Sequence, residues 1–218
     1  TAPDKRSRLI DTLFERPEYS EFWAMKWTDL LRADKLKVTP QGTVGLTRWL
    51  RKQFRDNRPY DEFVKEIITS QGAVQTESPV AFFKSMDTPE VAARSVSQLF
   101  LGVRIECAQC HHHPFERWSQ DDYYSLAAFF TQVGRKPSGV RGEDLIFHKR
   151  GIAQATNIKT GIAMKPAALG DAIPPIAPDE DPRLKLADWL STPSNPFFAR
   201  ALVNRYWKHF MQRGLIEP

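Results

Sequence analysis

Two cysteines and a histidine in the middle of the chain have the clearest capacity for chemistry. Cys107, Cys110 and His111 follow one another as Cys-x-x-Cys-His, and the 218 residues contain no other cysteine. Two thiols at this spacing can form thioether bonds to the vinyl groups on one edge of a porphyrin, and the next residue then offers an imidazole to the iron. The pattern therefore predicts one covalently bound haem c, with His111 as an axial ligand.

Other uses of the same side chains stay open. Together with His113, the two cysteines and His111 supply nitrogen and sulfur ligands suited to zinc, although structural zinc sites usually draw their ligands from two separated segments. A redox-active Cys-x-x-Cys pair normally belongs to a βαβ context, which the flanking pattern does not show. A structural disulfide between Cys107 and Cys110 is the simplest alternative.

The spacing does not fix a second axial ligand. His113 follows His111 too closely to reach the opposite face of the same haem without an awkward loop, but it could orient a ligand or a propionate by hydrogen bonding. Met164 lies in an expected loop, a setting that suits a distal methionine. More distant candidates are His148, His209, Met25, Met86 and Met211, of which His209, Met25 and Met211 are expected to pack in the core. An iron without a sixth ligand would suit a haem enzyme such as a peroxidase.

Aromatic residues follow the motif closely. Phe115 and Trp118 could line a haem crevice and count among the candidate cofactor-binding residues, although ordinary core packing explains them nearly as well. The chain has no Gly-x-Ser-x-Gly, Walker, Gly-x-Gly-x-x-Gly or His-Glu-x-x-His pattern, so these catalytic and nucleotide-binding classes have no support.

Composition indicates an ordinary globular chain. Hydrophobic residues make up 41% and charged residues 26%, and the net charge of +5 comes from basic residues interleaved with acids. No apolar run approaches the roughly 18 residues of a membrane helix. No zinc-finger, RNA-binding or helix-turn-helix signature accompanies the basic residues, so nucleic acid is not an expected partner. The chain opens at Thr1-Ala2-Pro3, which we interpret as a cut from a longer protein.

The elements that must position the motif are mostly helices, with a small irregular β part. Expected helices are 7–14, 18–36, 44 to about 57, 61–69, 89–102, 119–130, 184–190 and one that starts after Asn195-Pro196 and stops at Gly214. Turns or loops are expected at 40–42, 71–79 and 159–161, strands at 145–148 and 152–155, and an extended connector at 173–178. The expected domains are a helical domain (1–134) with the motif, an irregular β/loop segment and connector (135–182), and the helical start of a following domain (183–218).

The stretches 102–118, 120–124 and 127–130 resemble a known family. They are similar to the large planctomycete secreted cytochrome-associated domain, a family of unknown function. Its core is Cys-x-x-Cys-His-x-His-Pro-[Phe/Tyr], followed by a tryptophan and an aromatic helix. The matching positions here are Cys107, Cys110, His111, His113, Pro114, Phe115 and Trp118.

The resemblance extends over nearly the whole chain. Segments 16–31 and 58–64 fit the same family, and the tail 195–218 is similar to the start of the planctomycete domain that usually follows it. This implies a piece of an exported multidomain protein, often with a separate cytochrome c module. One departure matters: Asn157-Ile158 stands where relatives often have His-Pro, so a distal ligand at that position is not expected.

The expected function is electron transfer by a c-type haem protein in the periplasm or outside the cell, because haem is attached to this motif outside the cytoplasm. Its partner would be a redox protein or a neighbouring cytochrome module, and association into oligomers is left open. The alternatives are a zinc-stabilised structural or interaction module and a haem enzyme with an open iron position.

Overall fold

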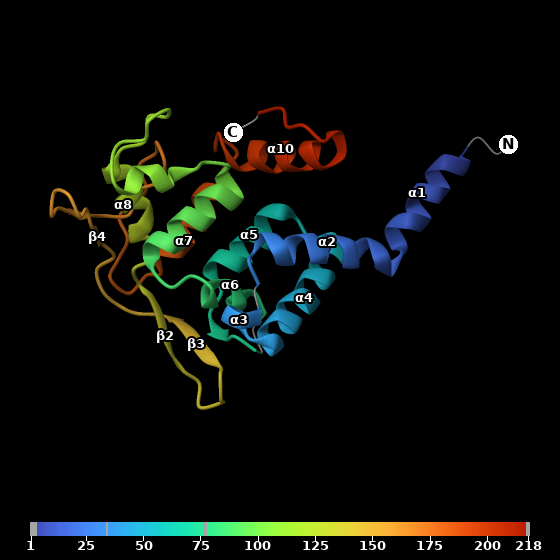
Figure 1. Ribbon diagram of the computed structural model, residues 1–218, viewed down its shortest axis with the longest axis horizontal. Helices are drawn as coiled ribbons and strands as arrows, with labels where there is room; N and C mark the ends of the chain where they lie inside the picture. Colours follow the sequence, from blue (N-terminus) through green and yellow to red (C-terminus); the bar gives the residue numbers. More distant parts are fainter. Residues whose placement is uncertain (1–3, 34, 76–77, 217–218) are drawn as a thin grey trace. The chain divides into compact units, whose positions relative to one another are not determined.

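The computed structural model describes residues 4–33, 35–75 and 78–216, except the side chains of Lys35 and Ser78. It confirms the predicted mainly α fold with small β segments (Figure 1). The chain forms two compact units, which we call unit 1 (residues 1–85 and 135–146) and unit 2 (86–134 and 147–218). This grouping differs from the three-part division expected from the sequence, and that division stays a prediction about domains.

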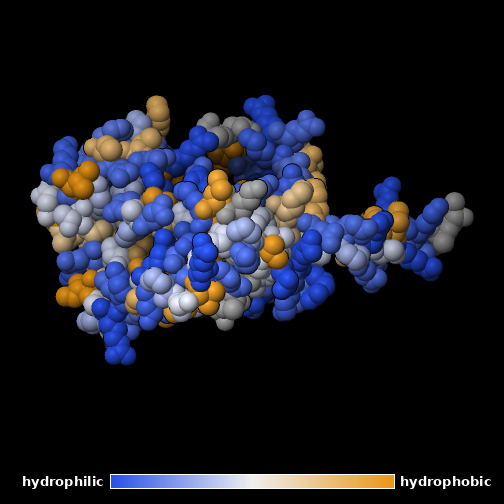
Figure 2. Space-filling view, turned by 60° about the horizontal axis from the view of Figure 1, so that its bottom comes forward, coloured by the Kyte–Doolittle hydropathy of each residue, from blue (hydrophilic) through white to orange (hydrophobic). Residues whose placement is uncertain are grey.

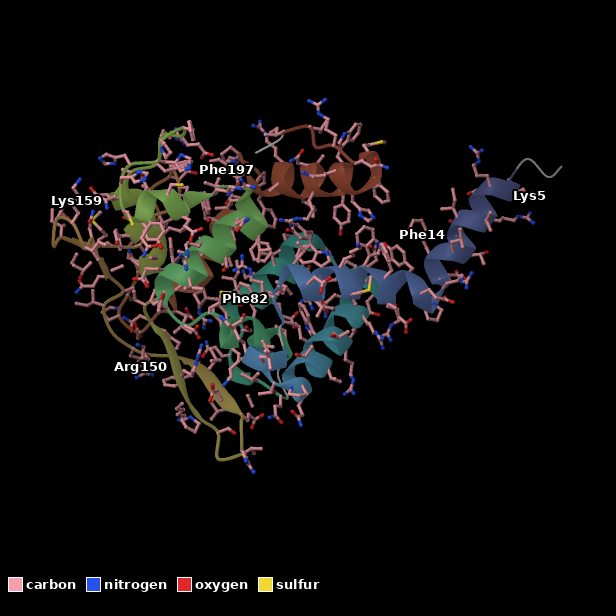
Figure 3. The ribbon with its side chains drawn as sticks, viewed as in Figure 1. Lys5, Phe14, Phe82, Arg150, Lys159 and Phe197 are labelled. Atoms are coloured by element: carbon pink, nitrogen blue, oxygen red, sulfur yellow. The ribbon has the colours of Figure 1, made fainter. Side chains whose placement is uncertain are left out.

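Unit 1 is a helical cluster with an aromatic core. Its elements are α1 (Lys5–Glu15), α2 (Pro17–Leu30), α3 (Lys35–Val38), α4 (Pro40–Arg55), α5 (Tyr60–Thr69), β1 (Gly72–Ala73), η1 (Ser78–Val80) and α6 (Ala81–Lys84). Phe63 of α5 meets Trp27 of α2 edge-on at 5.0 Å between ring centroids and stacks on Trp49 of α4 at 5.2 Å. Phe82 of α6 is fully buried (Figure 3). In contrast, α1 has no buried residue, and Figure 2 shows orange apolar side chains exposed along it.

Two expectations for this unit are wrong. The helix predicted for 18–36 ends at Leu30, and α3 is separate. The turn predicted at 40–42 is the first turn of α4, because a proline suits the first helical position, where its missing N–H is not needed. The hydroxyl of Thr39 caps this helix by accepting a hydrogen bond from the backbone N–H of Gly42 at 3.2 Å.

The β part is small and antiparallel. β3 (Asp144–His148) confirms the strand predicted at 145–148, and it pairs with β1 and with β2 (Val133–Pro137), neither of which was expected. The strand predicted at 152–155 is reduced to β4 (Ala155–Thr156), which pairs with β5 (Ala163–Met164) across the predicted turn. Lys159 lies in that turn (Figure 3).

Unit 2 contains the helices around the cysteine motif. Its elements are α7 (Pro89–Val96), the π-helical turn η2 (Ser97–Leu101), the 3₁₀ helix η3 (Ile105–Gln109), α8 (Gln120–Ala128), α9 (Pro182–Leu190) and α10 (Phe198–Met211). The start of the helix predicted over 89–102 is confirmed: α7 begins at Pro89, and the hydroxyl of Thr88 caps it by accepting a hydrogen bond from the N–H of Val91 at 3.3 Å. Ser119 and Asp122 form a reciprocal capping box at the start of α8.

Several expectations about the ends and faces of helices are wrong. α10 ends at Met211, and Gln212 rather than Gly214 takes the left-handed conformation after it, with φ of 65°. Met25 and Met211, expected in the core, are 52% and 58% exposed, and His209 is exposed as well. Helical spacing marks an apolar face but does not say whether another element covers it. In the described part of the chain, no helix has both the length and the hydropathy needed to cross a membrane.

Candidate functional site

The two cysteines lie in η3 and directly after it. In a 3₁₀ helix, side chains three residues apart lie above one another. Ile105 and Ala108 are fully buried and form the inner face of η3. Cys107, and Cys110 directly after the last residue of η3, are both exposed and free. The local fold therefore presents both cysteines on the surface, with no disulfide between them.

Side chains of neighbouring helices hold η3 in place. The carbonyl oxygen of Gln109 accepts hydrogen bonds from the side-chain amide of Gln120 at 3.1 Å and from the hydroxyl of Tyr124 at 3.3 Å. On the other side, Arg94 of α7 forms an ion pair with Glu106 at 2.7 Å. Gln120 and Tyr124 were not among the predicted site residues. The sequence marks them by their i, i+4 spacing on the helix after the motif and by their place in the stretch 120–124 that resembles the family.

Tyr124 is also close to Cys110. Burial raises the pKa of the Tyr124 hydroxyl, and the backbone N–H of Ile158 acts in the opposite direction. The negative charge of Glu90 raises this pKa further. A single buried hydroxyl thus lies near the end of η3, the second cysteine and the turn between β4 and β5.

His111 has the hydrogen bond expected of a metal ligand. Its Nδ1 lies 2.7 Å from the carbonyl oxygen of His112. A carbonyl only accepts, so Nδ1 bears the proton, and in a neutral imidazole the lone pair is then on Nε2. Metal-ligating histidines commonly donate their other ring N–H to a carbonyl in this way. The exposed His111 therefore offers Nε2 as a ligand atom.

His113 has the opposite arrangement. Its Nδ1 accepts hydrogen bonds from the backbone N–H groups of Phe115 at 3.2 Å and Glu116 at 2.9 Å. The lone pair is therefore on Nδ1, and the proton of the neutral ring is on Nε2. In this geometry His113 has no lone pair left for a metal. Its predicted role as a ligand stays a prediction, and this geometry does not favour it.

The two aromatic candidates differ in their surroundings. Phe115 is 93% exposed, whereas Trp118 is only 4% exposed. Trp118 packs edge-on against Phe197 at 5.9 Å between ring centroids (Phe197 is labelled in Figure 3), and its indole N–H donates to Glu116 at 2.6 Å. Trp118 thus anchors the loop after the motif, and Phe115 is the aromatic ring at the open surface.

Met164, the predicted distal ligand, lies half-buried on β5 and pairs with Ala155 of β4. The hairpin of β4 and β5 packs on α8, the same helix that holds η3. Asn157, at the position where no ligand was expected, is buried and donates from its side-chain amide to Asp121 of α8 at 2.8 Å. Met164 is therefore in unit 2 with the motif, and its ligand role stays a prediction.

The other candidates lie in different settings. His148 ends β3, and Met86 is buried. Among the residues that the structure describes, no group of three or more histidine, cysteine, aspartate or glutamate side chains is arranged to hold a metal ion.

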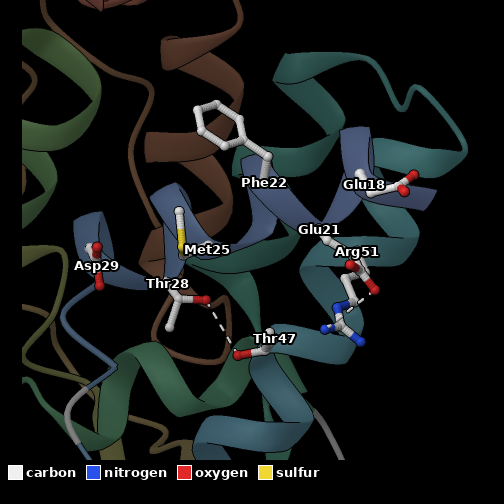
Figure 4. Close-up of a pocket in the computed structure, with 8 residues that line it drawn as sticks. All are labelled: Glu18, Glu21, Phe22, Met25, Thr28, Asp29, Thr47 and Arg51. Atoms are coloured by element: carbon white, nitrogen blue, oxygen red, sulfur yellow. Dashed lines mark hydrogen bonds and ion pairs between the residues drawn. The ribbon is translucent and has the colours of Figure 1, made fainter. Parts of the chain in front are cut away.

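A separate surface cavity lies in unit 1. It has a volume of about 560 Å³ (Figure 4) and is lined by Glu18, Glu21, Phe22, Met25, Thr28, Asp29, Thr47 and Arg51. Arg51 pairs with Glu21 at 3.7 Å, and the hydroxyls of Thr28 and Thr47 lie 3.3 Å apart. This lining contains neither cysteine nor histidine, so the chemistry predicted from the sequence belongs to unit 2.

Fold and site together define a mainly α protein that presents Cys-x-x-Cys-His on its surface. The model of the family PSCyt2, described as "Protein of unknown function (DUF1549)", matches residues 1–135, and that of PSD1, "Protein of unknown function (DUF1553)", matches residues 182–218. The chain belongs to the PSCyt2 family, because the first match covers more than half of it. The order of the two matches confirms the two-family arrangement that the resemblance predicted. Comparisons with curated proteins and with solved structures give no match.

Proposed function

We propose that Cys107 and Cys110 bind one haem c covalently, that His111 is an axial ligand, and that the protein transfers electrons. One observation supports this most: both cysteines are exposed in and directly after η3, and Nδ1 of the histidine that follows donates to a carbonyl, which leaves Nε2 as the ring atom able to bind a metal. The donor set therefore fits the group in number and order. A bound haem c would supply a one-electron Fe(III)/Fe(II) couple.

Each residue of the site has a separate task in this proposal. Cys107 and Cys110 fix the group to η3, which Gln120 and Tyr124 hold through the carbonyl of Gln109. The carbonyl of His112 orients the imidazole of His111. We propose Met164 as the distal ligand, since its hairpin packs on the helix that positions η3.

We also propose a compartment and a class of partner for the protein. Thioether attachment of haem takes place outside the cytoplasm, so we propose a periplasmic or extracellular protein. Its partner would be a redox protein or a neighbouring cytochrome module. The family name PSCyt2 agrees with such a partner without identifying it.

A pyridine haemochrome spectrum tests the proposal directly. The full chain is produced in a bacterial periplasm with the haem-attachment machinery, denatured and extracted with acidified acetone. We expect a retained band of the thioether-linked type. Cys107→Ala and Cys110→Ala should each remove one thioether and shift that band, and the double variant should lose all haem on extraction.

Replacing His111 tests the axial ligand. His111→Ala should change the iron spin state seen in the absorption spectrum. His112→Ala is the matched control, because it retains the main-chain carbonyl that accepts from His111. A colourless wild-type protein would overturn the haem proposal, and elemental analysis would then test for zinc. Carbon monoxide binding to the reduced protein would indicate an open iron position, as in a haem enzyme.

A further inference from the structure

The imidazole of His113 has a task that the proposed function does not use. We propose that His113 is a positioning residue: its Nδ1 closes the loop 113–118 by accepting from two backbone N–H groups, the closed loop orients His111 through the main chain, and His113 is not an iron ligand. The effect of His113 on haem rests on the proposed function. The two hydrogen bonds to its Nδ1, which we call the lock, exist in the haem-free chain.

The lock satisfies the backbone donors at the start of the loop. The N–H of His113 donates to the carbonyl of Trp118 at 2.8 Å, and Pro114 has no N–H. The next two N–H groups, of Phe115 and Glu116, both donate to Nδ1 of His113. Without this ring the exposed loop would have to satisfy two donors with water, and its conformation would no longer be fixed.

Locking and ligation exclude each other. A neutral imidazole has one lone pair, and the two backbone N–H groups use it on Nδ1. Ligation through Nε2 would move the proton to Nδ1, which could then accept neither hydrogen bond. A metal bound by His113 would therefore open the loop that follows the motif.

One peptide unit connects the lock to His111. The carbonyl of His112 and the N–H of His113 belong to the same planar peptide, so they turn together. The N–H points to Trp118 at 2.8 Å, and the carbonyl accepts from Nδ1 of His111 at 2.7 Å. Trp118 is buried against Phe197, which makes the far end of the loop a fixed point. The direction of the His111 ring is therefore set by the loop that His113 closes.

The first experiment uses the full chain with Cys107→Ala and Cys110→Ala, which leaves no thiol for haem. Long-range ¹H–¹⁵N correlation spectra at neutral pH should show His113 with the proton on Nε2. Amide exchange at Phe115 and Glu116 should be about tenfold faster in His113→Ala, because one hydrogen bond is lost at each amide. His113→Asn should restore slow exchange, since Oδ1 of asparagine can accept at nearly the same place. An Nδ1–H form of His113, or exchange unchanged in His113→Ala, would overturn the lock.

The second experiment uses the haem protein. His113→Ala should retain haem but broaden the axial-ligand signals in the electron paramagnetic resonance spectrum, and His113→Asn should restore sharp signals. His112→Ala is the control and should match the wild type. A change of ligand type in His113→Asn would show that His113 ligates the iron and would overturn the proposal. A colourless wild-type protein would overturn the haem function and, with it, the positioning role.

Discussion

His111 and His113 are two residues apart, yet their rings hold their protons on opposite nitrogens. The partner decides this: His111 faces a carbonyl, which only accepts, and His113 faces N–H groups, which only donate. Residue type alone gives both the same ligand chemistry. The same is true of Phe115 and Trp118, of which one is exposed and the other buried.

Trp118 should be the residue of this loop on which stability depends most. Replacing a buried tryptophan with alanine typically costs about 3–5 kcal/mol, because apolar contacts are lost and a cavity remains. We expect Trp118→Ala to lower the free energy of unfolding by an amount near the bottom of that range, measured by urea denaturation with circular dichroism. Phe115→Ala, at a 93% exposed side chain, is the control and should change it by less than about 0.5 kcal/mol. Equal losses in the two variants would contradict the anchoring role of Trp118.

The motif lies between two helical segments, and the end of η2 and the start of α8 fix its position. η2 ends at Leu101, Gly102 after it takes φ of +70°, and the chain then enters η3, which contains the first cysteine. α8 begins at the capping box of Ser119 and Asp122, which places Gln120 and Tyr124 opposite the carbonyl of Gln109. Local chain chemistry thus determines the start and the end of the segment with the motif.

Substitutions at two residues with a left-handed backbone conformation should change the stability of unit 2 in opposite directions. Gly102→Ala should destabilise unit 2 by about 1–2 kcal/mol, because an L side chain is strained at positive φ and its Cβ would lie 3.4 Å from Cβ of Ala201. Gln212→Gly, after α10 at φ of 65°, should stabilise the same unit by up to about 1 kcal/mol for the same reason. Thermal unfolding by circular dichroism measures both. A stabilising Gly102→Ala would contradict the assigned backbone conformation.

At the scale of the whole molecule, the chain builds two units with separate cores. Residues 135–146 belong to unit 1 although they follow α7, η2, η3 and α8 of unit 2 in the chain, so neither unit is one continuous stretch. The match to PSCyt2 over residues 1–135 includes parts of both units. The cysteine motif, its supports and the hairpin with Met164 all belong to unit 2.

Alkaline pH should weaken unit 2 through its buried tyrosines. Burial is the main cause that raises the pKa of Tyr123 far above its usual value near 10, and it raises that of Tyr124 in the same direction. Above about pH 10 the unfolded chain loses these protons while the folded unit retains them, so the unfolded state binds fewer protons and stability falls as pH rises. Urea midpoints between pH 8 and 11 should fall, and Tyr123→Phe should make that fall shallower. An identical slope in the variant would show that Tyr123 does not cause it.

Local patterns in the sequence predicted most of the helices and the position of Cys107, Cys110 and His111 between two of them. Helical spacing, the capping residues Thr88 and Ser119, and the Cys-x-x-Cys-His order are local properties, and the structure confirms the mainly α class and most helix starts. Which side chains are covered depended on the tertiary structure, because burial comes from residues elsewhere in the fold. The hydrogen bonds of the His111 and His113 rings come from the conformation of the loop itself, which spacing and residue type do not predict. Met25 and His209 are therefore exposed despite helical patterns that predicted a core, and His113 closes a loop although its type suits a ligand.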